Sequence, residues 1–344
     1  MYPPDDRVIF CLYPPSFQTS PCDMPIYWYG VLIVLGLLLG AYVASREAHR
    51  RGVDPDHVWG ALTWALVLGL VGSRLYHMLT PPPSMGVTAW QYLTGLNENG
   101  WPNFLDFRRG GLGVLGAIGG GLIGIAIYCR RNKLNFLTAA DLGGIGMPLG
   151  HAIGRWGNFF NQELYGGPTT LPWGVRIDYP LPPYDRYPAG TLYHPAFLYE
   201  SVWNLLSFGL IFAVGRRYGE RLLKGELFAM YIVLYGIGRM LTETVRLDSP
   251  TFPFAGLDVN YASLFAGLAA LAAIVLVFAR RRMAANGRNI GDSPAGVQQD
   301  KIAMTDAEYA DEYEDEAEED VPAEDAEDEE EDGEEVDVEE EAGK

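Results

Sequence analysis

Cysteine is scarce in this sequence of 344 residues, with only Cys11, Cys22 and Cys129 present. Their spacing does not match the paired ligands of a structural zinc site. Cys129 ends an apolar run and has no obvious disulfide partner. Cys11 and Cys22 could form a disulfide if the N-terminus lies outside the cytoplasm, and two free thiols fit the sequence equally well. The sequence therefore excludes a zinc-finger or disulfide-rich scaffold, and we expect no metal site.

The N-terminal region also lacks the pattern of a cleavable signal peptide. The first apolar run begins only near Ile26 and has no basic segment of the usual kind before it. The run is also too long for the hydrophobic region of such a leader. We therefore expect it to remain in the mature protein as a membrane span, preceded by an extracytoplasmic leader of residues 1–25.

Acidic residues are sparse outside the C-terminal segment. Residues 301–344 hold 24 of the 44 acidic residues and 2 of the 25 basic ones, so the rest of the chain has a net charge of +3. This segment has too little apolar surface to offset the chain entropy lost on folding, and its charges repel one another. We expect residues 283–344 to be a disordered acidic tail. A solubilising role and a regulatory or partner-binding role both remain open for it.

Seven apolar runs approach the length of about 20 residues that a helix needs to cross a bilayer. In chain order they are 26–44, 58–79, 110–129, 142–160, 195–214, 227–245 and 259–279. The fourth is the weakest, because glycines, Pro148 and ionisable residues dilute it. The predicted fold is an all-α integral membrane protein with seven transmembrane helices. We expect residues 26–282 to form its membrane domain.

Glycines recur on one side of the third run. They are Gly113, Gly116, Gly120 and Gly124, and the last three make two overlapping G-x-x-x-G patterns. Small residues at this spacing let two helix backbones approach closely. The pattern predicts a tight helix–helix contact.

The basic residues of the short loops predict the orientation in the membrane. Alternate connections carry Arg and Lys, as in the segments 46–51, 130–133, 216–224 and 280–282. We expect that side to be cytoplasmic. The N-terminus would then lie outside and the acidic tail inside.

Ionisable residues inside a membrane are costly, so each is a candidate for function. With the predicted orientation, five of them fall in the outer half of the membrane. They are Arg74, Arg155, Glu200, Arg239 and Glu243. Helical spacing places His151, Arg155 and Asn158 on one face, and likewise Tyr235, Arg239, Glu243 and Arg246. Their shared depth predicts one outward-facing polar site. The alternative is that Arg155 and Arg239 pair with Glu200 and Glu243 only to hold the helices together.

The segment 154–166 reads GRWGNFFNQELYG. It resembles the signature G-R-x-G-N-F-x-N-x-E-x-x-G of the prolipoprotein diacylglyceryl transferases at all eight fixed positions. Four further segments resemble that family in the same order along the chain. They are WYG at 28–30, GSRLYH at 72–77, HPAFLYE at 194–200 and YGIGRMLTETVR at 235–246. The resemblance covers about residues 25–280, and the family's seven spans with an outside N-terminus agree with the orientation predicted above.

The resemblance implies transfer of the diacylglyceryl group of phosphatidylglycerol to the lipobox cysteine of a prolipoprotein, with no metal or other cofactor. It implies that Arg155 and Arg239 bind the phosphate, since guanidinium donates bidentately and stays charged. It further implies that Asn158 and Asn161 donate hydrogen bonds and that Glu243 orients Arg239 or shapes the headgroup pocket. Other members of the implied site are Tyr29 and Tyr235, which would line the cavity, Arg74, and the signature residues Glu163, Gly166 and Arg246, whose roles are not separated. His194 and Glu200 fit a functional or a structural role equally well.

One position departs from the family pattern. Many members have a histidine in the third span, proposed as the base for the thiol, where this sequence has Gly119. His151, one turn before Arg155, is the candidate substitute because an unperturbed imidazole titrates in the right range. A helix-packing role for His151, with the proton lost to water or to phosphate, is the alternative.

The expected partners are phosphatidylglycerol, prolipoprotein signal peptides with a lipobox cysteine, and the membrane itself, with no nucleic acid. The expected location is the bacterial plasma membrane. A transporter or channel for an anionic solute is the alternative function, because a polar cavity with arginines also suits it. Such folds usually show internal repeats and polar groups near the membrane midplane, and neither pattern is apparent here.

Overall fold

The computed structural model describes residues 8–11, 25–81, 88–96, 102, 113–177, 184–247, 251–254 and 257–286. The chain divides into two units, Met1–Ala303 and Met304–Lys344, and all described residues belong to the first. The acidic tail was predicted to be disordered, and its residues beyond position 286 lie outside the described residues. The Cys11–Cys22 pairing also lies outside them, because Cys22 is not described, whereas Cys129 is a buried free thiol.

Seven long helices occupy the seven predicted apolar runs. They are α1 (Trp28–Arg50), α2 (Asp56–Leu79), α4 (Val114–Arg131), α5 (Phe136–Asn161), α6 (Ala196–Tyr218), α7 (Glu226–Glu243) and α8 (Tyr261–Ala285). Short helices are also present: α3 (Ala89–Thr94) and the 3-10 turns η4 (Tyr184–Arg186) and η5 (Gly219–Arg221). Helix α8 continues past residue 282, where the acidic tail was predicted to begin.

Within the described residues, five helices are long and apolar enough to cross a membrane: α1, α2, α4, α6 with its extension to Arg221, and α8. This confirms a mostly helical, multi-pass membrane protein. The two remaining long helices, α5 and α7, contain Arg155 and Arg239. The helices with the weaker apolar signal are therefore the ones that carry the candidate phosphate-binding arginines.

Three two-stranded antiparallel sheets accompany the helices, which the all-α prediction did not include. They pair β1 (Val8–Cys11) with β2 (Pro25–Tyr27), β3 (Val175–Arg176) with β4 (Leu192–Tyr193), and β5 (Thr251–Phe254) with β6 (Leu257–Asn260). Each sheet is short and lies in a connection or before the first long helix. Hydropathy over windows of about 20 residues is insensitive to such short strands.

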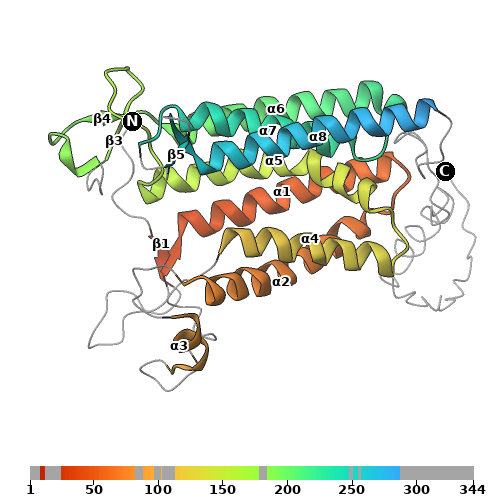
Figure 1. The fold of residues 1–344 in the computed structure, drawn as a ribbon, viewed down its shortest axis with the longest axis horizontal. Helices are drawn as coiled ribbons and strands as arrows, with labels where there is room; N and C mark the ends of the chain where they lie inside the picture. The colour runs from red at the N-terminus through yellow and green to blue at the C-terminus, as the bar shows by residue number, and fades with distance from the viewer. Residues whose placement is uncertain are drawn as a thin grey trace, which may run out of the picture. The chain divides into compact units, whose positions relative to one another are not determined.

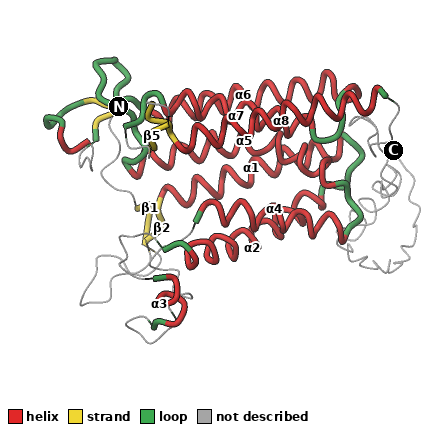
Figure 2. The backbone as a smooth tube through the Cα atoms, in the orientation of Figure 1, coloured by secondary structure: helices red, strands yellow, loops and turns green. Residues whose placement is uncertain are grey.

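Helix α5 is central to the helix packing (Figures 1 and 2). It packs against α1, α6 and α7, while α2 packs chiefly against α4, and α7 against α8. Two hydrogen bonds attach the start of α7 and the residue before it to α5. The Asp141 carboxylate accepts hydrogen bonds from the backbone N–H of Gly225 at 2.7 Å and of Phe228 at 2.9 Å. A side chain of α5 thus satisfies amide groups at the start of α7, which the helix cannot satisfy itself.

The predicted close contact through glycines is confirmed between α4 and α2. A Cβ atom built on Gly116 would lie 2.1 Å from the Gly72 carbonyl oxygen, and one on Gly120 would lie 2.1 Å from the Leu68 carbonyl oxygen. One on Gly124 would lie 2.5 Å from the Trp64 carbonyl oxygen. These obstacles are backbone atoms, which cannot rotate away as a side chain can. The helix pair therefore requires glycine at these positions.

Replacing Gly120 by alanine should destabilise the folded protein by about 1–3 kcal/mol, because the added methyl group must push two helix backbones apart. Gly119 is a matched control on the same helix, since a Cβ atom there has nothing within 4 Å. We expect Gly119→Ala to leave the melting temperature in detergent unchanged or slightly raised and Gly120→Ala to lower it. Equal melting temperatures for the two variants would contradict this account of the α2–α4 contact.

Candidate functional site

Three helices bring two arginines to one carboxylate. Glu200, in the second turn of α6, is buried. Its Oε2 atom forms an ion pair with Nε of Arg155 on α5, and its Oε1 atom lies 3.6 Å from Nη1 of Arg239 on α7. Glu200 therefore joins the three helices at a single point.

A second carboxylate, that of Glu243, also pairs with Arg239. Glu243 lies one turn later on α7 and forms an ion pair with Nη2 of Arg239. The side-chain amide of Asn260 donates a hydrogen bond of 3.0 Å to Oε2 of Glu243, and its oxygen accepts one from Ser263 N–H at the start of α8. Asn260 thus links the site to α8. Its position before an apolar run is the usual sequence signal for a helix cap, but nothing in that signal indicated a contact with Glu243.

Both guanidinium groups remain partly accessible. The side chain of Arg155 is 25% exposed and that of Arg239 is 18% exposed. A guanidinium group carries five N–H donors in a rigid fork. The ion pairs described above use only part of that donor set, so each arginine retains the capacity to bind another anion.

The signature segment ends α5 with a compact polar turn. The side-chain amides of Asn158 and Asn161 each donate a hydrogen bond of 3.1 Å to Oε1 of Glu163. Gln162 and Leu164 take left-handed backbone conformations, with φ of 54° and 55°. The three polar signature residues therefore form one hydrogen-bonded group, and Asn158 lies one turn after Arg155 on the same helix face.

Two of the three signature glycines, Gly157 and Gly166, are closely packed, whereas a Cβ atom on Gly154 would have nothing within 4 Å. Gly166 N–H donates a hydrogen bond of 2.8 Å to the His194 carbonyl oxygen, and a Cβ atom on Gly166 would lie 2.9 Å from the Val245 carbonyl oxygen. A Cβ atom on Gly157 would lie 2.6 Å from Cδ2 of Tyr29. Gly166 thus joins the segments that follow α5, precede α6 and follow α7, which supports a structural role.

These segments rest on a small aromatic core. Its buried residues are Tyr165, Val175, Ile177, Tyr184 and Tyr193. Tyr184 donates a hydrogen bond from its hydroxyl to the Tyr165 carbonyl oxygen at 2.8 Å, and Tyr193 donates one to the Tyr184 carbonyl oxygen at 3.2 Å. This core fixes the connection between α5 and α6, whose two ends carry Glu163 and His194.

His151 lies among aromatic rings on α5. Its ring centroid is 6.1 Å from that of Tyr231 and 5.9 Å from that of Tyr235. Its Nδ1 atom is 3.4 Å from the Tyr231 hydroxyl. Tyr231 was not among the predicted site residues, because an apolar helix offers many tyrosines and only the packing shows which one meets His151.

Two further arginines, Arg74 and Arg246, were predicted to belong to the site. Arg74 is buried on α2, which packs chiefly against α4 and not against the helices of Arg155 and Arg239. The prediction that Arg246 extends the helical face of Tyr235, Arg239 and Glu243 is wrong, because α7 ends at Glu243. Residues 244 and 245 form a turn, so Arg246 lies beyond the end of the helix that carries the other three residues.

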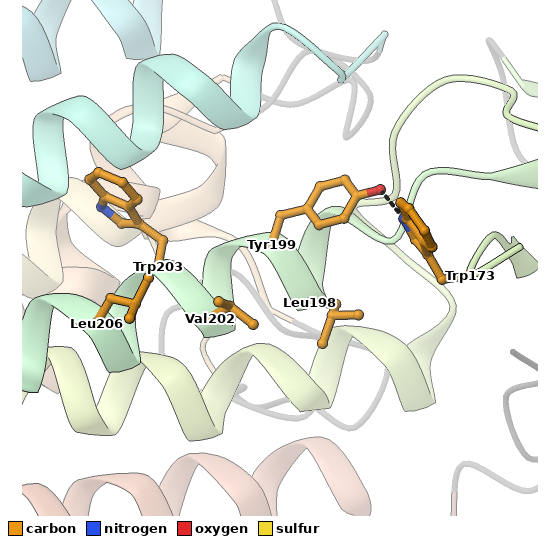
Figure 3. Close-up of a pocket in the computed structure, with 6 residues that line it drawn as sticks. All are labelled: Trp173, Leu198, Tyr199, Val202, Trp203 and Leu206. Atoms are coloured by element: carbon orange, nitrogen blue, oxygen red, sulfur yellow. Dashed lines mark hydrogen bonds between the residues drawn. The ribbon is translucent and has the colours of Figure 1, made fainter. Parts of the chain in front are cut away.

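An apolar pocket lies on a different face of α6. It has a volume of about 420 Å³ and is lined by Trp173, Leu198, Tyr199, Val202, Trp203 and Leu206 (Figure 3). Trp173 Nε1 donates a hydrogen bond of 3.0 Å to the Tyr199 hydroxyl at one end. The lining contains no ionisable carboxylate or basic group, so the pocket suits hydrocarbon and not a phosphate.

Gly119, which stands where many family members have a histidine, has free space around it. A Cβ atom on Gly119 would have nothing within 4 Å. Space for a side chain therefore exists there, and the absence of a histidine is not explained by crowding. Among the described residues, no group of three or more His, Cys, Asp or Glu side chains has a geometry that could hold a metal ion.

Over most of its length the chain is similar to one family of known proteins. Residues 16–279 match the family model described as prolipoprotein diacylglyceryl transferase. The phosphatidylglycerol–prolipoprotein diacylglyceryl transferase of Chloroflexus aggregans is 41% identical, over 72% of this chain and 80% of the relative. That of Symbiobacterium thermophilum is 39% identical, over 81% of this chain and 97% of the relative. That of Clostridioides difficile is 37% identical, over 71% of this chain and 84% of the relative.

Proposed function

This chain belongs to the prolipoprotein diacylglyceryl transferase family, and from that premise we propose that it transfers the diacylglyceryl group of phosphatidylglycerol to the lipobox cysteine of prolipoproteins. The observation that carries the proposal is the joining of Arg155 and Arg239 to Glu200 across the three helices α5, α7 and α6. Two guanidinium groups with unused donors form a site for one phosphodiester. The matched relatives are named as transferases, so we do not retain the transporter alternative.

The proposed reaction is an alkylation of sulfur. The cysteine sulfur attacks the glycerol carbon that carries the phosphate ester, a carbon–sulfur bond forms, and the carbon–oxygen bond breaks. The bonding electrons pass to the phosphate oxygen, so the phosphate of the departing glycerol 1-phosphate carries one more negative charge than it did in phosphatidylglycerol. Arg155 and Arg239 stabilise that charge as it develops, which is where fixed donors accelerate a reaction most. The products are a thioether on the prolipoprotein and glycerol 1-phosphate.

The other site residues take positioning roles in this proposal. Glu200 and Glu243 orient the arginine forks and prevent the two cations from repelling each other. Glu163 holds Asn158 and Asn161 beside the phosphate, where their remaining donors and acceptors meet the headgroup. Tyr29, which lies against Gly157, and Tyr235, which packs against His151, line the space for the lipid beside the arginines in this proposal. Arg246 and Arg74 bind the substrate farther from the reacting bond.

His151 is the test case for the thiol base. Because its Nδ1 atom faces Tyr231 and its ring packs against two tyrosines, we expect His151→Gln to lower kcat/KM less than tenfold and to leave its pH profile in place. A general base contributes about 10²–10⁴-fold, so a loss of that size, with the acid limb of the profile removed, would assign the base to His151. The thiol proton otherwise passes to water or to the phosphate.

We also propose the full membrane arrangement. All seven long helices span the bacterial plasma membrane, the N-terminus lies outside, and residues 26–282 form the catalytic domain. The family match, which ends at residue 279, supports a tail without a catalytic role.

Cysteine labelling tests this orientation. In a variant whose three native cysteines are replaced by serine, a cysteine at position 191 should react with an impermeant maleimide in intact cells. One at position 285 should react only after the cells are opened. The basic residues at the ends of α1, α4, α6 and α8 favour this result. The reverse labelling pattern would overturn the orientation but not the family assignment.

A further inference from the structure

Five arginines line one cavity between the last turn of α1 and the end of α6. They are Arg50, Arg51, Arg216, Arg217 and Arg221, and the cavity has a volume of about 260 Å³. Glu200 and Arg216 are both on α6, and the helical rise places them about 24 Å apart along the axis. The cavity, which we name the basic pocket, is therefore separate from the site described above.

The basic pocket keeps a positive charge after its carboxylates are counted. Glu47 is 1% exposed and is shared by three of the arginines: its oxygens lie 2.5 Å from Arg50 Nη2, 3.1 Å from Arg51 Nη2 and 3.5 Å from Arg216 Nε. Glu220 also lines the pocket, and Asp141 interacts electrostatically with Arg51. Among the described residues, five cations thus face three carboxylates, which leaves two positive charges.

Several guanidinium groups are held in place by packing. Arg51 is buried, and its approach to α6 depends on Gly215, where a Cβ atom would lie 3.0 Å from Arg51 Nη2. The Arg216 guanidinium lies over the Phe212 ring, 4.2 Å from its centroid. The tendency of basic residues to gather on the cytoplasmic side explains arginines at helix ends. It does not explain why the end of α1, the end of α6 and the following turn η5 direct five of them into one cavity.

We propose that the basic pocket binds a phosphate group. Arginine forks match phosphate oxygens bidentately, and ordered forks lose little conformational entropy on binding. Two sources carry the same chemistry at this end of the bundle: the headgroup of an anionic phospholipid, which basic pockets between membrane helices are suited to bind, and a soluble phosphate compound. The proposal is independent of the transfer reaction, since the pocket lies far from the reacting bond.

The test compares melting temperatures of the full chain in phosphatidylcholine nanodiscs, alone, with phosphatidic acid in the bilayer, or with inorganic pyrophosphate in the buffer. Binding to the folded state should raise the melting temperature by roughly 3–5 °C near saturation. The pocket variant combines Arg216→Gln, Arg217→Gln and Arg221→Gln, three exposed positions whose replacement leaves the buried Arg51 intact.

The matched control variant combines Arg46→Gln, Arg130→Gln and Lys133→Gln. It removes the same total charge from three exposed positions outside the pocket, which lie near the C-terminal ends of α1 and α4. We expect the control variant to keep the rise and the pocket variant to lose most of it. A rise with phosphatidic acid alone identifies a lipid, and a rise with pyrophosphate alone identifies a soluble ligand.

Equal loss in the two variants would show that only general surface charge matters and would overturn the proposal. The absence of any rise in the wild-type chain with either probe would do the same. If the pocket variant already melts lower in phosphatidylcholine alone, Arg217→Glu replaces it, because reversing one exposed charge should also abolish the rise. None of these outcomes depends on diacylglyceryl transfer, so failure of this proposal and failure of the proposed function are distinguishable.

Discussion

Replacing Arg239 by lysine should lower kcat/KM for diacylglyceryl transfer by about 10²-fold or more while leaving the melting temperature nearly unchanged. Lysine keeps the positive charge and can still pair with Glu243 one turn away. It cannot reproduce the planar fork that holds two phosphate oxygens at once. The same reasoning applies to Arg155→Lys. Asn158→Ala should cost less, because a neutral donor contributes less than a charge-assisted one.

The measurement is transfer of radiolabelled lipid from phosphatidylglycerol to a lipobox peptide, with membrane insertion and melting temperature as controls. A double variant sharpens it. If Arg239 only pairs with Glu243 to hold the helix, Arg239→Met with Glu243→Met should give an active enzyme, whereas the phosphate role predicts an inactive one. Near-normal turnover in both lysine variants would refute the phosphate assignment without affecting the family membership.

Replacing Glu200 by glutamine should damage both stability and activity, because Glu200 is the carboxylate shared by the two arginines. Removing one partner of a buried ion pair costs about 3–5 kcal/mol, and the partial exposure of both arginines reduces this to about 2–3 kcal/mol. We expect kcat/KM to fall about tenfold to 10²-fold, since both guanidinium forks lose their orientation.

A ligand effect separates this role from simple helix packing. With Glu200 neutral, the two arginines repel each other, and a bound phosphodiester relieves that repulsion. Phosphatidylglycerol should therefore raise the melting temperature of Glu200→Gln more than that of the wild-type chain. Asp185→Asn, the same loss of a carboxylate charge at an exposed position outside both sites, should alter neither the melting temperature nor kcat/KM. Wild-type stability and turnover in Glu200→Gln would show that Glu200 does not hold the site.

The sequence predicted the helices well because membrane spans need long apolar runs, and all seven runs became helices. The ends were less accurate. Helix α5 was predicted to start near residue 142 but begins at Phe136, where the Asn135 side chain caps it. The added residues 136–141 include Thr138 and Asp141, which interrupt the apolar run but not the helix, so hydropathy alone underestimates its length.

The site was predictable where one helix carries the whole pattern. Arg239 and Glu243 lie four residues apart and do pair, and the signature residues Asn158, Asn161 and Glu163 do form one group. Contacts between helices were not predictable in this way, because they depend on how each helix is rotated and where it crosses its neighbours. Asn260 therefore gained its role only from the structure, as did Tyr231 beside His151. The sequence suggested Glu200 as a partner of the arginines, and the structure shows that it contacts both of them.

The central claim is that this chain forms a thioether between a lipobox cysteine and the diacylglyceryl group of phosphatidylglycerol. The most direct measurement is mass spectrometry of a lipobox peptide after incubation with the purified chain and phosphatidylglycerol, together with assay of released glycerol 1-phosphate. The account predicts a diacylglyceryl adduct on cysteine that resists hydroxylamine at neutral pH, one glycerol 1-phosphate per adduct, and neither product with a Cys→Ser peptide. An unmodified peptide, or a hydroxylamine-labile acyl group in place of the thioether, would contradict it.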